Sequence, residues 1–96
     1  MTEIVIRAHV LGRVQGVGYR AWARGTANRL SLRGWARNRS DGAVEVVVAG
    51  PADRVALFLE ACKSGPPFAE VSAVEAAEES DPDAAGVPPA GFRISG

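Results

Sequence analysis

Apolar and polar residues alternate near the start of the chain. In EIVIRAHVL, residues 3–11, the apolar residues Ile4, Ile6, Ala8 and Val10 occupy every second position. A period of two is typical of a β-strand with one apolar face. We therefore expect the chain to begin its fold with a strand.

The apolar period lengthens to three and four residues in two later segments. Tyr19, Ala23 and Leu30 predict a helix from residue 19 to about residue 30. The second helix follows Gly50-Pro51, because proline is tolerated in the first turn of a helix. Its apolar stripe at i, i+3, i+4 and i+7 consists of Val55, Phe58, Leu59 and Cys62.

The remaining apolar segments are short and predict further strands. The chain reads LRGWARN at 32–38, AVEVVVA at 43–49, FAEVSAVEAAEE at 68–79 and FRIS at 92–95. SDG at 40–42 is a hairpin signal between the first two of these strands. Residues 80–91, rich in proline, glycine and aspartate, predict a loop before a short C-terminal edge strand.

The order of these elements predicts the fold class. The order β-α-β-β-α-β is that of the α+β, ferredoxin-like βαββαβ sandwich, in which two helices pack on one face of an antiparallel sheet. Right-handed crossovers place both helices on the same side. We expect one domain over residues 1–96, since this length supports a single core.

Composition narrows the functional classes. The chain is 47% hydrophobic and 23% charged, which is typical of a globular protein. No apolar run approaches the roughly 20 residues of a membrane helix, and MTEIVIRAHV does not resemble a signal peptide. Cys62 is the single cysteine, so neither a disulfide nor a CxxC zinc pair is expected. These features predict a cytoplasmic monomer with no metal, no cofactor and no membrane partner.

The charges are unevenly distributed along the chain. Residues 1–39 hold eight arginines and one acid, a balance of +7, whereas residues 40–96 hold three bases and ten acids, a balance of −7. The first half is therefore expected to attract anions. Pairing between the two halves is the alternative for most of these arginines.

The segment GRVQGVGYR, residues 12–20, predicts an anion site. Glycines between a strand and a helix let successive backbone N–H groups converge on one anion. The segment has neither the GK[ST] ending of a P-loop nor the GxGxxG spacing of a dinucleotide fold, so a small anion is favoured. Arg20, in the first helical turn, can bind two phosphate oxygens in a fork, or it can lie in solvent.

Asn38 is the second candidate. Asparagine is unfavourable within strands, and it lies just before the predicted hairpin. Its amide could help to initiate the turn, which spacing alone favours. It could instead donate to and accept from a water molecule, and so hold that water in place.

Together, GRVQGVGYR and GWARNRSDGAVEVVVAG resemble the signature pair of the acylphosphatase family. The helix VALFLEAC and the segment GPPFAEVSAVE continue the similarity in the expected order, from about residue 4 to residue 78 and again at FRI near the end. Tyr19 stands where the family often has phenylalanine, and the proline-rich segment 80–91 replaces a tighter link between strands.

The resemblance implies an enzyme that hydrolyses acyl phosphates, which are small-molecule mixed anhydrides, to a carboxylate and inorganic phosphate. It implies that Arg20 binds the phosphate and that Asn38 orients the attacking water. It also implies a metal-free reaction without a covalent intermediate. The backbone of Gln15, Gly16, Val17, Gly18 and Tyr19 is the implied phosphate cradle.

A non-catalytic anion- or RNA-binding module of the same fold is the alternative function. RNA-recognition domains stack bases on aromatic residues of the sheet. This chain has six aromatic residues and nothing that resembles the RNP1 pattern, so no nucleic-acid partner is expected. His9 is interpreted as an exposed sheet histidine rather than a base, and Cys62 as a buried small hydrophobe. The sequence does not identify the physiological acyl phosphate.

Overall fold

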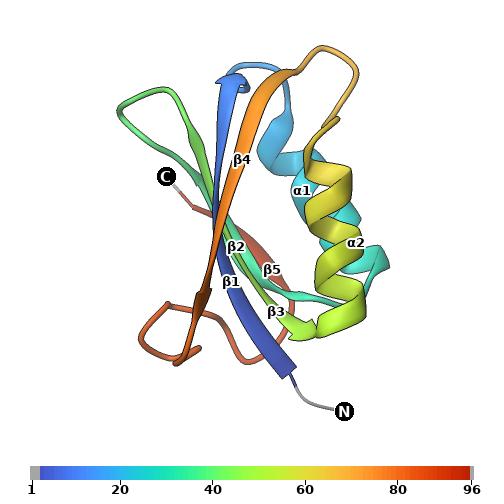
Figure 1. Cartoon of the computed structure of the whole chain (residues 1–96), viewed down its shortest axis with the longest axis vertical. Helices are drawn as coiled ribbons and strands as arrows, with labels where there is room; N and C mark the ends of the chain where they lie inside the picture. The colour runs from blue at the N-terminus through green and yellow to red at the C-terminus, as the bar shows by residue number, and fades with distance from the viewer. Residues whose placement is uncertain (1–2, 96) are drawn as a thin grey trace.

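The computed structural model describes residues 3–95, which form two helices and one five-stranded sheet (Figure 1). The elements in chain order are β1 (Glu3–Arg13), α1 (Tyr19–Arg29), β2 (Arg33–Asn38), β3 (Val44–Pro51), α2 (Ala52–Cys62), β4 (Glu70–Glu79) and β5 (Phe92–Ser95). All the predicted elements are present. The predicted fourth strand begins two residues later than expected, at Glu70.

The strands lie in the order β4-β1-β3-β2-β5. The first three pairings are antiparallel as predicted, but β5 pairs with β2 in parallel, so the expectation of a wholly antiparallel sheet is wrong at this edge. The reason is the chain path. The 80–91 segment joins β4 to β5 at one end of the sheet, so β5 runs opposite to β4 and therefore in the direction of β2.

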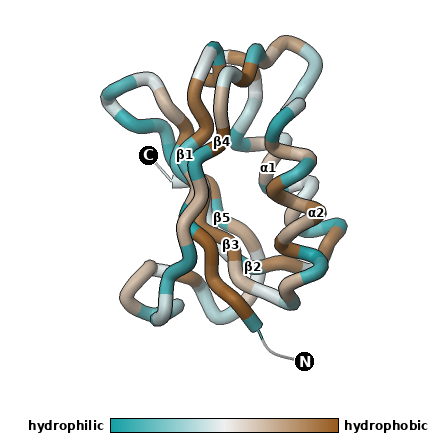
Figure 2. Tube along the Cα trace, in the orientation of Figure 1, coloured by the Kyte–Doolittle hydropathy of each residue, from teal (hydrophilic) through white to brown (hydrophobic). Residues whose placement is uncertain are grey.

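Both helices cover one face of the sheet, and the main core lies between them and the strands (Figure 2). Valines of β1 and β3 meet the apolar stripes of α1 and α2 there. The core residues include Val10, Tyr19, Ala23, Ala27, Val44, Val46, Val48, Val55, Phe58 and Cys62. Complete burial of a valine or phenylalanine side chain stabilises a fold by about 1.5–3 kcal/mol. This core therefore anchors the loops at the ends of β1 and β2.

The 80–91 segment packs under the opposite face of the sheet. Ala85 and Val87 are buried against Val5, Val47 and Ala49 in a second, smaller core. Trp35 Nε1 donates a hydrogen bond to the Ala85 carbonyl at 2.8 Å. The long link between β4 and β5 is therefore an ordered part of the fold.

None of the helices in the described residues 3–95 is long and apolar enough to cross a membrane.

Candidate functional site

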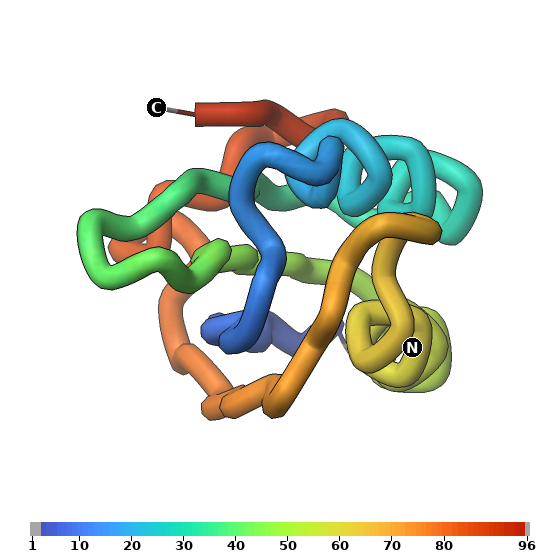
Figure 3. The backbone as a smooth tube through the Cα atoms, turned by 90° about the horizontal axis from the view of Figure 1, so that it is seen from above, coloured from blue at the N-terminus to red at the C-terminus, as the bar shows by residue number. Residues whose placement is uncertain are grey.

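Three segments that are distant in sequence meet at one end of the sheet. Seen from above, the loop after β1 passes between the β2–β3 hairpin and the segment that leads into β4, and then enters α1 (Figure 3). The end of β5 lies beside the start of α1. This arrangement brings the two sequence motifs, at 12–20 and 34–42, to the same end of the molecule.

Two glycines shape the loop between β1 and α1. Gly16 has φ 76°, and Gly18, the residue before the first helical turn, has φ 80° and ψ 20° in the left-handed region. A Cβ atom added at either position would meet nothing within 4 Å. The glycines are therefore required by the backbone conformation and not by crowding.

The N-terminus of α1 is free to receive an anion. No side chain caps it, and its first turn contains no acidic residue. Within residues 3–95, no backbone N–H of residues 15–18 donates to a backbone carbonyl. Unpaired N–H groups and the positive end of the helix dipole thus face the same region, which favours a phosphate oxygen there.

A cavity of about 180 Å³ opens at this helix terminus. Arg20 and Asn38, which are 18 positions apart in sequence, both line it, and Ile94 of β5 completes the wall. The other lining residues are Val14, Gly16, Gly18, Tyr19 and Ala21. Two of the predicted cradle residues, Gln15 and Val17, do not line the cavity.

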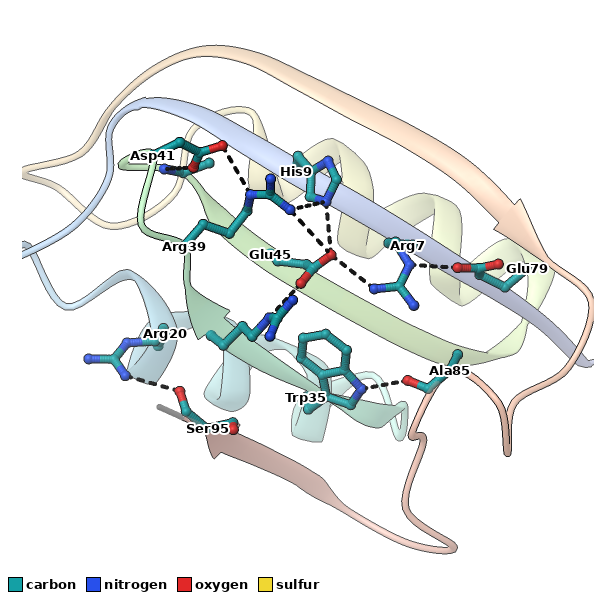
Figure 4. A network of polar contacts seen from close by, with 12 residues as sticks. Arg7, His9, Arg20, Trp35, Arg39, Asp41, Glu45, Glu79, Ala85 and Ser95 are labelled. Atoms are coloured by element: carbon teal, nitrogen blue, oxygen red, sulfur yellow. Dashed lines mark hydrogen bonds and ion pairs between the residues drawn. The ribbon is translucent and has the colours of Figure 1, made fainter.

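Arg20 lies in the first turn of α1 and lines the cavity. Its Nη1 donates to the Ser95 carbonyl of β5 at 3.3 Å, and the side chain is half-buried (Figure 4). This single long hydrogen bond holds the guanidinium near the loop and leaves four of its five N–H donors for a ligand.

Asn38 is the last residue of β2 and its Cα pairs with that of Val44 on β3. The side chain is half-buried, and its amide makes no hydrogen bond to any residue in the described range 3–95. The Asn38 side chain therefore makes no hydrogen bond that would initiate the turn. Asp41 makes such a bond instead, because its carboxylate accepts the Ala43 N–H at 3.0 Å. The Asn38 amide remains able to bind a water molecule.

The side chains of Val17 and Tyr19 take part in the packing of the core. Val17 packs against the core, and Tyr19 buries its ring, with its hydroxyl donating to the Cys62 carbonyl at 2.7 Å. Burial raises the pKa of the Tyr19 phenol, as does the nearby Cys62, so this hydroxyl stays protonated. Tyr19 thus lines the cavity while its ring belongs to the core.

A network on the opposite sheet face was missed by the sequence reasoning. Glu45 of β3 is only 2% exposed, and it binds His9, Arg7 and Arg37 at 2.9, 2.9 and 2.6 Å. Arg39 Nη1 lies 3.9 Å from the same carboxylate (Figure 4). His9 is half-buried in this network, so its interpretation as an exposed histidine is wrong. The sequence does carry one signal of this network, because Glu45 is a single acid inside the valine-rich segment AVEVVVA.

The network keeps Glu45 ionised. Burial alone would raise the pKa of the carboxyl, but hydrogen bonds from His9, Arg37 and Arg7 outweigh it and lower the pKa to about 2. Among residues 3–95, no group of three or more His, Cys, Asp or Glu side chains could hold a metal ion. Glu45 is the centre of a network of charged side chains on the sheet face away from the helices.

Sequence comparison identifies relatives of this chain. The acylphosphatase family model matches residues 6–94. An acylphosphatase of Azoarcus sp. is 53% identical over 77 residues, covering 80% of this chain and 79% of the relative. An acylphosphatase of Rhodopseudomonas palustris is 46% identical over 95 residues, covering 99% of this chain and 95% of the relative.

Structural comparison agrees with the sequence. The crystal structure of acylphosphatase from Bacillus subtilis is similar with a TM-score of 0.88 and 35% identity, covering 97% of this chain and 99% of that one. This near-complete structural match accompanies a family model that spans almost every described residue. The chain therefore belongs to the acylphosphatase family.

Proposed function

We propose that this acylphosphatase-family enzyme hydrolyses acyl phosphates by placing the phosphoryl group between the Arg20 guanidinium and the backbone N–H groups of the 15–19 loop. Asn38, on the facing wall, orients the water molecule that attacks phosphorus. The observation that carries the proposal is the shared cavity, because Arg20, Asn38 and the glycine loop line one space of about 180 Å³.

The chemistry requires charge stabilisation more than acid–base groups. The leaving group of an acyl phosphate is a carboxylate, which departs without being protonated. Catalysis can therefore rest on positioning the water and on stabilising charge over the phosphoryl oxygens. Arg20 and the loop N–H groups supply the stabilisation, and Asn38 supplies the positioning.

The lining of the cavity contains no base. None of its described residues is an aspartate, glutamate or histidine, and an asparagine amide does not accept a proton near neutral pH. The proton of the attacking water therefore passes to a phosphoryl oxygen of the substrate. Attack forms the new P–O bond, the P–O bond to the acyl group breaks with its electron pair on the carboxylate, and inorganic phosphate leaves.

The test is the release of phosphate from benzoyl phosphate in the presence of EDTA. We expect Arg20→Ala and Asn38→Ala each to lower kcat/KM by at least about a hundredfold, or about 3 kcal/mol. Arg20→Lys should recover little of the loss, because lysine carries the charge without the fork of donors. Arg24→Ala is the matched control, since Arg24 is an exposed arginine one turn further along α1.

Three results would contradict the proposal. If the Asn38→Ala enzyme keeps the wild-type rate, Asn38 does not position the water. If Arg24→Ala loses as much activity as Arg20→Ala, the general positive charge of α1 matters and the position of Arg20 does not. A rate that EDTA abolishes would contradict the metal-free mechanism.

The proposal extends to the whole chain acting as one domain, in the cytoplasm, as a monomer that uses no nucleic acid or membrane partner. The sheet does not favour an RNA-binding alternative. Arg7 and Arg37 lie over the Trp35 ring at 5.8 and 5.6 Å from its centroid, so the ring already packs against two guanidinium groups. Light scattering of the purified chain tests the monomer, and a shift of its mobility by RNA would contradict the absence of that partner.

A further inference from the structure

The Gln15 side chain makes contacts that the proposed role of its backbone in the phosphate loop does not explain. This side chain is turned away from the cavity, toward the turn between β2 and β3. The Gln15 Nε2 donates to the Arg39 carbonyl at 2.8 Å and to the Ala43 carbonyl at 2.9 Å. Both hydrogens of the amide are therefore used, on carbonyls at the two sides of one turn.

These two carbonyls already close the turn. Arg39 N–H donates to the Ala43 carbonyl at 2.8 Å, and Gly42 N–H donates to the Arg39 carbonyl at 3.2 Å. Gln15 supplies a further donor to each of them. Arg39 directly follows Asn38, so the amide holds the backbone one residue from the proposed water-positioning side chain.

Little else connects the loop to the hairpin. The β1–β3 ladder ends at the pair Val10 and Val44. Beyond it, β1 continues to Arg13 paired with β4, and only then does the loop begin. Within residues 3–95, the two hydrogen bonds of Gln15 are the only ones that join residues 14–18 to residues 38–43. Gln15 itself follows Val14, which is 1% exposed, so the brace is anchored in the core.

We infer that Gln15 is a positioning residue, whose side chain fixes the distance between the phosphate loop and Asn38. This inference rests on the proposed roles of the loop and of Asn38. A water molecule held by Asn38 must lie in line with a phosphoryl group held by the loop, so the two walls have to keep one separation. Without the brace, the phosphate still binds, but the water is no longer held in line.

The experiment is a double-mutant cycle with benzoyl phosphate. Gln15→Met keeps the length of the side chain and removes both donors. We expect it to lower kcat by about tenfold or more, because small displacements of a reacting group have effects of this size. KM and the inhibition constant of inorganic phosphate should stay within about twofold. Ser40→Ala is the matched control in the same turn, where the side chain is exposed and makes no hydrogen bond to residues 3–95.

The cycle separates this inference from the proposed function. If Gln15 acts through Asn38, adding Gln15→Met to the Asn38→Ala enzyme should lower its residual kcat by less than about twofold. A further tenfold loss in that background would overturn the inference, as would a matching rise of the phosphate inhibition constant in the single variant. A fully active Asn38→Ala enzyme would overturn the proposed function instead.

A spectroscopic measurement covers the case of a very low residual rate. Gln15 is the only glutamine of the chain, so its side-chain amide gives a single identifiable pair of NMR signals. We expect both protons to exchange slowly with water in the wild type. In Gln15→Met, the Asn38 amide signals should move while the amides of α1 stay in place. Rapid exchange of both Gln15 protons, or unmoved Asn38 signals, would contradict the brace.

Discussion

Glu45 offers the sharpest test of what stabilises the sheet. Its carboxylate is on a residue that is only 2% exposed, and Arg7, His9 and Arg37 bind it directly. A third arginine, Arg39, places its Nη1 3.9 Å from the same carboxylate. The substitution Glu45→Gln removes the negative charge with little change of volume. It leaves three arginines and a histidine facing a neutral amide whose NH2 group cannot accept their hydrogen bonds.

The magnitude follows from the depressed pKa of Glu45. A shift from 4.5 to about 2 corresponds to about 3 kcal/mol of stability at neutral pH. Removal of one partner from a buried ion pair typically costs about 3–5 kcal/mol, which agrees with the value from the pKa shift. The half-exposed Arg37 can turn to water, which favours the lower end of that range. We therefore expect Glu45→Gln to lower the free energy of unfolding by about 3 kcal/mol at pH 7.

The dependence on pH has a definite sign. Since folding lowers the pKa of Glu45, the contribution of its carboxylate is fully present above pH 4.5. It is lost as the pH falls from 4.5 toward 2 and the group becomes protonated in the folded state as well. The wild type and the Glu45→Gln variant should therefore converge in stability over that range.

Urea unfolding followed by tryptophan fluorescence, from pH 7 down to pH 3, measures both effects. Glu78→Gln is the matched control because Glu78 is an exposed glutamate on β4, and its change should stay within about 0.5 kcal/mol. A loss below about 1 kcal/mol for Glu45→Gln at pH 7 would refute the reasoning. A loss that is the same at every pH would show that the defect is one of packing.

Two substitutions and one chemical modification test the loop and the core behind it. Gly18→Ala forces a side chain into the left-handed region at φ 80°, so the free energy of unfolding should fall by about 1–2 kcal/mol and phosphate should bind less tightly. A calorimetric titration with unchanged phosphate affinity would contradict this. Tyr19→Phe removes the hydrogen bond to the Cys62 carbonyl, and urea unfolding should show a loss of about 1 kcal/mol, whereas an unchanged midpoint would mean that this bond contributes nothing net. Burial raises the pKa of the Cys62 thiol to about 11. A disulfide reagent at pH 8 should therefore react with this thiol only as fast as the protein unfolds. Immediate reaction with the native protein would show that the thiol is not buried.

The elements and the main core could be predicted from the sequence because both depend on local spacing. The alternation of Ile4, Ile6, Ala8 and Val10 defines one face of β1, and the stripe from Val55 to Cys62 defines the buried face of α2. Backbone geometry alone ties a period of two to strands and a period near 3.6 to helices. The motif at 12–20 likewise indicated an anion site through its glycines and Arg20.

The sequence by itself therefore determined the elements, their order and the residue types that the chemistry needs. Only the tertiary structure decided that β5 lies parallel to β2, that Glu45 gathers His9 and three arginines, and that Gln15 turns from the cavity to the hairpin. Each of these depends on which segments, distant in sequence, become neighbours once the sheet forms. Local periodicity does not contain that information, because hydrogen bonds and ion pairs between distant residues are selected by the packing of the whole chain.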